Sequence, residues 1–144
     1  GSADGRGRLS EDLVKIVLDT NVLLAAFASR GLCEAVYEAC LIHHEIVLSE
    51  HILGELRRHL PRVLKVSAEH ADEVVTAIRG QAVMVTPVPV PKDACRDAHD
   101  LPVLGTLVAG DADCLVTGDD DLLALGEFRG KPILSPRGLH TLIS

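Results

Sequence analysis

Two short apolar runs, each followed closely by an acid, constrain the fold more than any other feature of this chain. The first run, 16–18, leads directly into Asp19, and the second, 114–116, leads into Asp119 after two residues. Runs that are apolar at every position are typical of strands buried on both faces, as in parallel sheets. The carboxyl ends of such strands open onto a common crevice. We therefore expect acids far apart in the chain to meet there.

Strand-like and helix-like segments alternate along the sequence. Strands are expected at 14–18, 45–48, 83–85, 115–117 and 132–134, and helices at 21–28, 32–42, 50–60, 68–79, 101–109, 122–125 and from 136 onward. Pro61 and Gly80 are expected to end two of the helices, and Ser49, Ser67 and Asp100 to cap the starts of others. This alternation predicts an α/β fold whose mainly parallel sheet of about five strands is covered on both faces.

The chain has the length of one domain with its own core. Of its 144 residues, 47% are hydrophobic but only 2% aromatic, so the core must be aliphatic and base stacking on an aromatic platform is disfavoured. We assign 13–144 to the domain and the polar, Gly-rich 1–12, which begins like an expression remnant, to a disordered tail. The four cysteines are interpreted as free thiols of a cytoplasmic protein, and no apolar run suggests a membrane span.

Charge is unevenly distributed. The net charge of −7 argues against a general binder of phosphate backbones. Eight aspartates and a single base lie in 93–121, whereas 57–65 contains bases and no acid. Arg57, Arg58 and Arg62 are therefore candidates for contacts with an RNA backbone, with a solvated helix end as the alternative.

Five acids lie where the chain changes from one element to the next or borders an apolar stripe: Asp19, Glu55, Asp100, Asp119 and Asp121. Singly, each is explained as a cap, a turn residue or a solvated side chain. Four carboxylates converging to ~5 Å would repel by roughly 3 kcal/mol per pair at an effective dielectric of ~20. Such a set needs a cation, and oxygen ligands select Mg²⁺ or Mn²⁺ over Zn²⁺.

A pocket of this kind suits phosphodiester hydrolysis by a metal-activated water, without a nucleophilic side chain. Thr20, Asn21 and Thr117 are placed to orient the water or a carboxylate by hydrogen bonding. The seven histidines are scattered, and we do not expect them to form a metal site.

Four blocks of the sequence resemble PIN-domain ribonucleases, in that family's order. They are 17–23 (VLDTNVL), 49–60 (SEHILGELRRHL), 95–106 (CRDAHDLPVLGT) and 112–123 (ADCLVTGDDDLL). The resemblance implies a three-layer α/β/α sandwich in which Asp19, Glu55, Asp100 and Asp119 are metal ligands and Asp121 is a further or substitute ligand. Asp97, like Asn21 and Thr117, matches a supporting position. Leu101 and Pro102 depart from the family pattern after the third acid.

The same resemblance implies a Mg²⁺- or Mn²⁺-dependent endoribonuclease, the toxin of a VapC-like toxin–antitoxin pair, with RNA as substrate, an antitoxin as partner and a homodimer as the assembly. One alternative is a non-catalytic PIN scaffold that binds metal or RNA. Another is a phosphoacceptor or phosphatase on a similar sheet, although Asn21 stands where a haloacid-type phosphatase would have its second aspartate.

Overall fold

The structure, a computed structural model, describes residues 13–143, so the predicted tail 1–12 lies outside the described residues. One sheet has the strand order β3-β2-β1-β4-β6-β5. Its strands are β1 (Lys15–Leu18), β2 (Glu45–Leu48), β3 (Val83–Met84), β4 (Cys114–Val116), β5 (Glu127–Phe128) and β6 (Lys131–Leu134). All neighbouring pairs are parallel except β5 and β6. The predicted mainly parallel sheet is confirmed, with six strands rather than about five.

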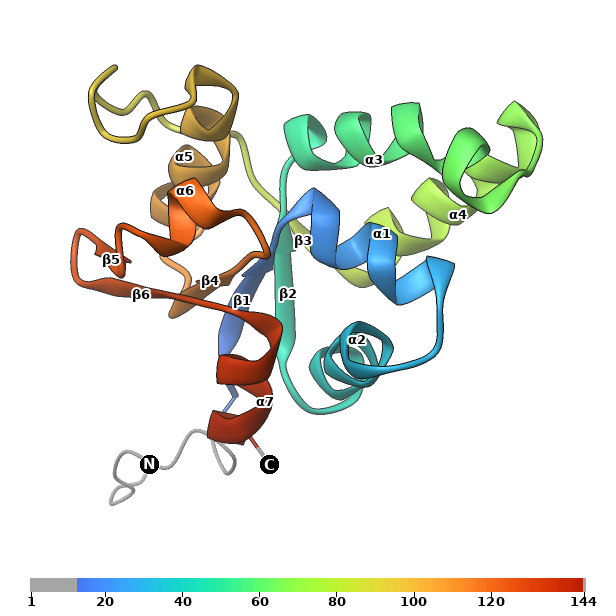
Figure 1. The fold of residues 1–144 in the computed structure, drawn as a ribbon, viewed down its shortest axis with the longest axis horizontal. Coiled ribbons are helices and arrows are strands. Elements are labelled where there is room, and N and C mark those ends of the chain that lie inside the picture. The colour runs from blue at the N-terminus through green and yellow to red at the C-terminus, as the bar shows by residue number, and fades with distance from the viewer. Residues whose placement is uncertain (1–12, 144) are drawn as a thin grey trace.

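Helices cover both faces of the sheet. They are α1 (Thr20–Ala28), α2 (Leu32–His43), α3 (Glu50–Leu64), α4 (Ala68–Gln81), α5 (Leu101–Ala109), α6 (Asp120–Leu123) and α7 (Pro136–Ile143), with a 3₁₀ turn, η1 (Ala98–Asp100), before α5. Figure 1 shows α5 and α6 on one side of the sheet and α1 and α2 on the other, while α3 packs against α1 and α4. This arrangement confirms the three-layer α/β/α sandwich.

The core is aliphatic, as the low aromatic content predicts. Ile16, Val17 and Leu18 of β1 are fully buried on both faces of the sheet, and β4 is buried throughout. A buried polar contact links α5 to the start of α3 within this core: the hydroxyl oxygens of Thr106 and Ser49 lie 2.8 Å apart, and Thr106 donates its hydrogen to the carbonyl of Pro102. Ser49 also caps α3 by accepting from the amide of Ile52, as predicted.

Strand β5 was not predicted from the sequence. It pairs antiparallel with β6 at the edge of the sheet. The turn between them contains Arg129 and Gly130, both with positive φ (51° and 82°). Two successive positive φ values are the signature of a tight hairpin turn, which glycine favours. The Arg-Gly pair was the available signal for this hairpin.

Two predicted helix ends are wrong. Helix α3 continues through Pro61 to Leu64, because its end is set by Lys65, which adopts a left-handed conformation (φ 56°) and donates its amide to the carbonyl of Pro61. Pro61 therefore removes one backbone donor from the interior of the helix without ending it. Gly80 likewise lies within α4, which ends one residue later.

Candidate active site

The carboxyl ends of β1 and β4 border a cavity of about 300 Å³, hereafter the acidic pocket. Four of the five predicted acids line it, from four separate segments of the chain. Its lining consists of Asp19, Thr20, Asn21, Leu24, His51, Glu55, His59, His99, Asp100, Val103 and Asp119. The sheet topology thus brings together the acids that the strand-end pattern predicted to meet.

Asp19 is the most constrained of these acids and is only 5% exposed. Its Oδ1 accepts a hydrogen bond from the amide of Thr20 (2.8 Å), and its Oδ2 accepts from the hydroxyl of Thr117 (2.8 Å) and the side-chain amide of Asn21 (3.3 Å). Its own amide donates to the carbonyl of Val116 on β4, which ties β1 to β4 at the pocket. These contacts hold the carboxylate in one orientation.

Asp119 is positioned by the turn that follows β4. Its amide donates to Thr117 Oγ1 (3.0 Å), and its Oδ2 accepts from the amide of Leu122, so that it also caps α6. Asn21 Oδ1 accepts from the amide of Gly118 (2.8 Å), and a Cβ on that glycine would approach the same oxygen to 3.3 Å. The β1 and β4 ends are therefore joined by a shared polar network that includes Asn21 and Thr117.

Asp100 carries the clearest sign of electrostatic strain. Burial, followed by the charges of Asp119, Asp19 and Asp97, raises its pKa from 3.8 to about 7. Its Oδ2 is buried and has no hydrogen-bond partner. Burial also raises the pKa of Asp19, the charge of Asp119 adds to this effect, and the hydrogen bonds from Thr117, Thr20 and Asn21 oppose it. Both pKa values are thus raised mainly by burial and further by neighbouring carboxylates, and no lysine or arginine lines the pocket to offset them.

The prediction that Asp100 caps α5 holds for its position but not for its side chain. Asp100 directly precedes α5, yet its carboxylate makes no capping hydrogen bond. Instead, Asp97 accepts a hydrogen bond from the amide of His99 and caps the preceding 3₁₀ turn. The extra turn directs the Asp100 carboxylate into the pocket.

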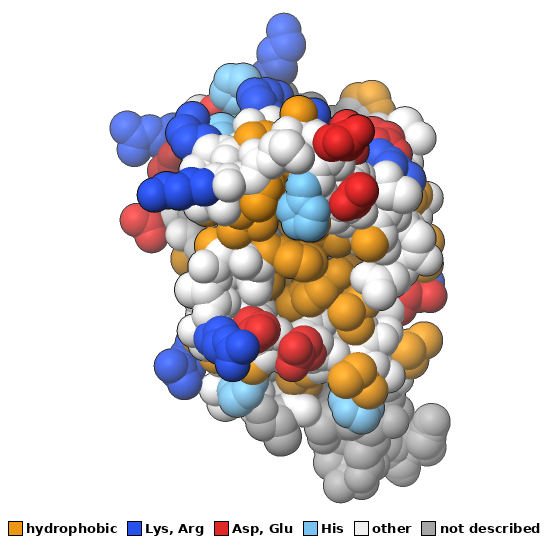
Figure 2. All heavy atoms as spheres, turned by 90° about the vertical axis from the view of Figure 1, so that its right-hand side faces the viewer, with side chains coloured by type: hydrophobic (Ala, Val, Ile, Leu, Met, Phe, Trp, Pro, Cys, Tyr) orange, Lys and Arg blue, Asp and Glu red, His pale blue; other side chains and the backbone are white. Residues whose placement is uncertain are grey.

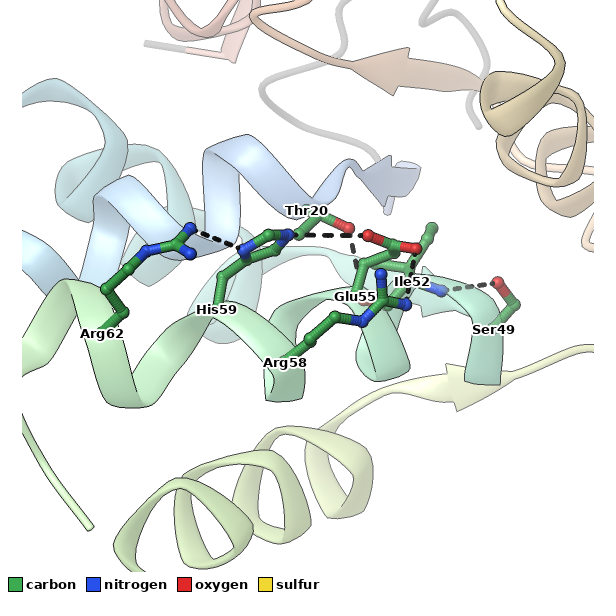
Figure 3. A network of polar contacts seen from close by, with 7 residues as sticks. All are labelled: Thr20, Ser49, Ile52, Glu55, Arg58, His59 and Arg62. Atoms are coloured by element: carbon green, nitrogen blue, oxygen red, sulfur yellow. Dashed lines mark hydrogen bonds and ion pairs between the residues drawn. The ribbon is translucent and has the colours of Figure 1, made fainter. Parts of the chain in front are cut away.

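Glu55 reaches the pocket from α3 and has charged neighbours on the same helix. Its Oε2 accepts from Arg58 (2.9 Å), and its Oε1 lies 3.7 Å from Nε2 of His59. Figure 3 shows these side chains along α3 beside Thr20, whose hydroxyl donates to the carbonyl of Ile52. Glu55 is thus the one pocket acid whose contacts are with basic groups.

The other predicted site residues lie outside the pocket lining. Asp121 lies in the first turn of α6, and Asp97 is exposed. Arg57 on α3 forms an ion pair with Asp72 on α4. This pair links the two helices and occupies the Arg57 guanidinium. Arg58 and Arg62 are exposed and contact Glu55 and His59, respectively.

Sequence reasoning missed two of the three pocket histidines. His51 and His59 line the pocket together with Glu55, whereas only His99 was noted as a neighbour of a proposed ligand. Residues 51, 55 and 59 recur every four positions, and side chains four apart share one face of a helix. That spacing was the signal that could have found them.

The donor set fits a hard cation. Four carboxylates border one cavity, one buried carboxylate oxygen has no partner, and both features are relieved by a bound divalent ion. Within residues 13–143, however, no group of three or more His, Cys, Asp or Glu side chains is arranged closely enough to hold a metal as it stands. A cation that binds Glu55 would have to displace Arg58 from its carboxylate.

A mainly parallel α/β/α sandwich with an acidic pocket at the ends of its central strands defines a class of proteins that includes the PIN domains. The family model described as PIN domain matches residues 15–121. The chain belongs to the PIN-domain family, as its four sequence blocks predicted.

Two solved structures have a similar fold. VapBC2 from Rickettsia felis, crystallised with a DNA fragment from its promoter, matches with a TM-score of 0.59 and 14% identity, over 84% of this chain and 98% of that one. VapC20 from Mycobacterium tuberculosis, a toxin that cleaves the sarcin-ricin loop, matches with a TM-score of 0.53 and 17% identity, over 81% and 98%. No curated protein matches the chain. Among the described residues, every helix falls short of what a membrane crossing requires.

Proposed function

We propose that this protein is a metal-dependent endoribonuclease that hydrolyses RNA phosphodiester bonds with Mg²⁺ or Mn²⁺. The observation that carries the proposal is the convergence of Asp19, Glu55, Asp100 and Asp119 on one cavity in which a buried oxygen of Asp100 is unpaired. Asp121 is proposed as a further or substitute ligand. A bound divalent cation would polarise the phosphoryl oxygen, lower the pKa of an attacking water and stabilise the leaving oxygen.

The protein's own part is to hold the ligands and to place the substrate. Thr117 and Asn21 fix the carboxylate of Asp19, so the orientation of this ligand is set before substrate arrives. Asp100 and Asp119 add charge beside it. No lysine or arginine lines the pocket, so contacts with the RNA backbone must come from its margin, where Arg58 and Arg62 are exposed. Arg57 is the weaker candidate because Asp72 already pairs with it.

The test is cleavage of single-stranded RNA with and without Mg²⁺ or Mn²⁺. We expect wild-type protein to cleave only with the cation, and Asp19→Asn and Glu55→Gln to be inactive while remaining folded. Glu38→Gln, which neutralises an exposed carboxylate on α2 outside the pocket lining, serves as the matched control. If folded wild-type protein binds RNA but never cleaves it, the alternative of a non-catalytic metal- or RNA-binding scaffold replaces this proposal. Labelling by acetyl phosphate would instead favour a phosphoacceptor.

We further propose that the protein is the cytoplasmic toxin of a VapC-like toxin–antitoxin pair and forms a homodimer. Support comes from the PIN-domain match and from the VapBC2 and VapC20 folds. A hollow of about 430 Å³, hereafter the apolar groove, supports a protein partner. It lies between α1, α2 and α4 and is lined by Phe27, Tyr37, Leu41, His70, Glu73, Val74, Ala77, Ile78 and Gln81. Figure 2 shows hydrophobic side chains gathered on this side of the molecule. Exposed apolar surface of this kind often marks protein interfaces.

Toxin function is tested by expression in cells. We expect wild-type protein to arrest growth and Asp19→Asn to be harmless at equal abundance. Co-expression with the product of a small neighbouring reading frame should restore growth and give a purified complex. Light scattering of the purified chain measures the oligomeric state, and a monomer would contradict the homodimer.

A further inference from the structure

Three side chains on α3 form a chain of contacts that ends in the acidic pocket. Arg62 Nη2 lies 3.0 Å from Nδ1 of His59, and Nε2 of the same ring lies 3.7 Å from Oε1 of Glu55. The three residues are spaced by four and three positions, so one helix face presents them in a row. Figure 3 shows the His59 ring between the guanidinium and the carboxylate.

The contact with Arg62 determines which nitrogen of His59 carries the proton. A guanidinium has only N–H donors, so the ring nitrogen that it contacts must be an acceptor. Nδ1 is therefore unprotonated, and the hydrogen of the neutral ring lies on Nε2, the nitrogen that faces Glu55.

Glu55 consequently has groups of different kinds on its two sides. Arg58 donates to Oε2 with a full charge from a largely exposed side chain. The Nε2–H of the neutral His59 ring faces Oε1 from the pocket wall across 3.7 Å, which is longer than a direct hydrogen bond. A charged guanidinium competes with a cation for the carboxylate. A neutral donor that closes on the carboxylate once Arg58 is displaced would orient it without cancelling its charge.

We propose that His59 is a positioning residue for Glu55, and that Arg62 acts through His59 by fixing its Nε2–H tautomer. Arg58, in contrast, competes with the metal for Glu55. The claim that His59 supports metal binding rests on the proposed function, whereas the claim about its tautomer does not. His59 thereby acquires a role in the site without being a metal ligand.

Calorimetric titration with Mn²⁺ tests the role of His59 in metal binding. We expect His59→Ala to weaken Mn²⁺ binding by about tenfold or more, the range for lost partners of metal ligands. His59→Gln, whose side-chain amide places an N–H near the position of Nε2, should recover to within about threefold of wild type. Arg62→Ala should give an intermediate loss, and Arg58→Ala should bind Mn²⁺ at least as tightly as wild type. The control is His70→Ala, which removes a histidine that pairs with Glu73 on α4.

Nitrogen NMR of the histidine rings, recorded without metal at about pH 8.5 where imidazoles are generally neutral, tests the tautomer. We expect His59 to be protonated at Nε2 in wild type and to become a mixture in Arg62→Ala. An Nδ1–H tautomer overturns the inference. Mn²⁺ binding that depends on Asp19 but is unchanged in His59→Ala also overturns it and leaves the proposed function intact. Absence of Asp19-dependent Mn²⁺ binding overturns the proposed function, while the NMR result still decides the Arg62–His59 arrangement.

Discussion

The acidic pocket and the apolar groove are hollows of similar size with opposite chemistry. The pocket, of about 300 Å³, collects carboxylates from β1, α3, the turn before α5 and the turn after β4. The groove, of about 430 Å³, is lined largely by apolar side chains of α1, α2 and α4, and its two rings, Phe27 and Tyr37, lie 5.3 Å apart. The pocket therefore depends on the topology of the whole sheet, and the groove on the packing of adjacent helices.

The difference shows where the fold tolerates unfavourable electrostatics. In the pocket, burial and mutual repulsion raise the pKa values of Asp19 and Asp100. In the groove, His70 and Glu73 are exposed and pair with each other, and burial alone, without a neighbouring charge, raises the pKa of Tyr37. Perturbed carboxylates in a concave site are a common sign of function. Changes in the pocket should consequently alter chemistry more than folding, and changes in the groove should leave chemistry untouched.

The largest expected effect is the loss of RNA cleavage in Asp19→Asn. We expect a decrease of at least about a hundredfold, because loss of a metal ligand should exceed the loss of a partner that merely supports one. The free energy of unfolding should change by less than about 1 kcal/mol, because relief of a buried charge opposes the loss of one hydrogen-bond acceptor. Cleavage rates and urea unfolding measure the two effects. A variant that is inactive because it is unfolded would contradict this separation.

Binding of Mn²⁺ should stabilise the wild-type protein. At a concentration a hundredfold above the dissociation constant, the free energy of unfolding should rise by about 2.7 kcal/mol. Asp19→Asn should show no such rise, and Tyr37→Phe in the groove should show the wild-type rise. Chemical unfolding with and without Mn²⁺ measures it, and equal stabilisation of wild type and Asp19→Asn would indicate binding elsewhere.

Much of the fold was predictable because its central strands carry their own signal. The apolar runs before Asp19 and Thr117 are buried on both sides in the structure, and α/β alternation then fixes a parallel sheet. Strand β5 escaped prediction because two residues contain no periodicity and its pairing depends on the Arg129–Gly130 turn. The end of α3 was misplaced because Pro61 seemed a stronger signal than the left-handed residue beyond it.

The pocket was predictable in part for the same reason. Acids at strand ends must converge when the strands are parallel, so Asp19 and Asp119 could be paired from the sequence alone. The contacts of Glu55 with Arg58 and His59 could not be predicted, because they depend on side-chain rotamers along α3. The buried, unpaired oxygen of Asp100 could not be predicted either, because its position depends on a 3₁₀ turn for which the sequence carries no clear signal.

The raised pKa of Asp100 should make stability depend on pH. Its pKa is about 7 in the folded protein and near 3.8 in an unfolded chain, so between these values the folded state holds a proton that the unfolded state has released. The group therefore stabilises the fold at low pH, and this contribution is lost as pH rises through about 7. Without divalent cations, wild type should lose stability between pH 5 and 8 relative to Asp100→Asn. Thermal unfolding across this range measures the difference, and parallel pH profiles would contradict it.

The smallest effect is expected in the groove, from Tyr37→Phe. Tyr37 is 7% exposed, and its hydroxyl donates a 3.2 Å hydrogen bond to the side-chain oxygen of Gln81, an exposed residue that water can satisfy instead. The variant keeps the ring contact with Phe27 and should lose only about 0.5–1 kcal/mol of unfolding free energy. Its Mn²⁺-dependent cleavage should equal that of wild type, because no residue of the groove lines the pocket. A Tyr37→Phe variant with impaired cleavage would show that the two hollows are energetically coupled through α1 or α2, and the contrast between them would no longer hold.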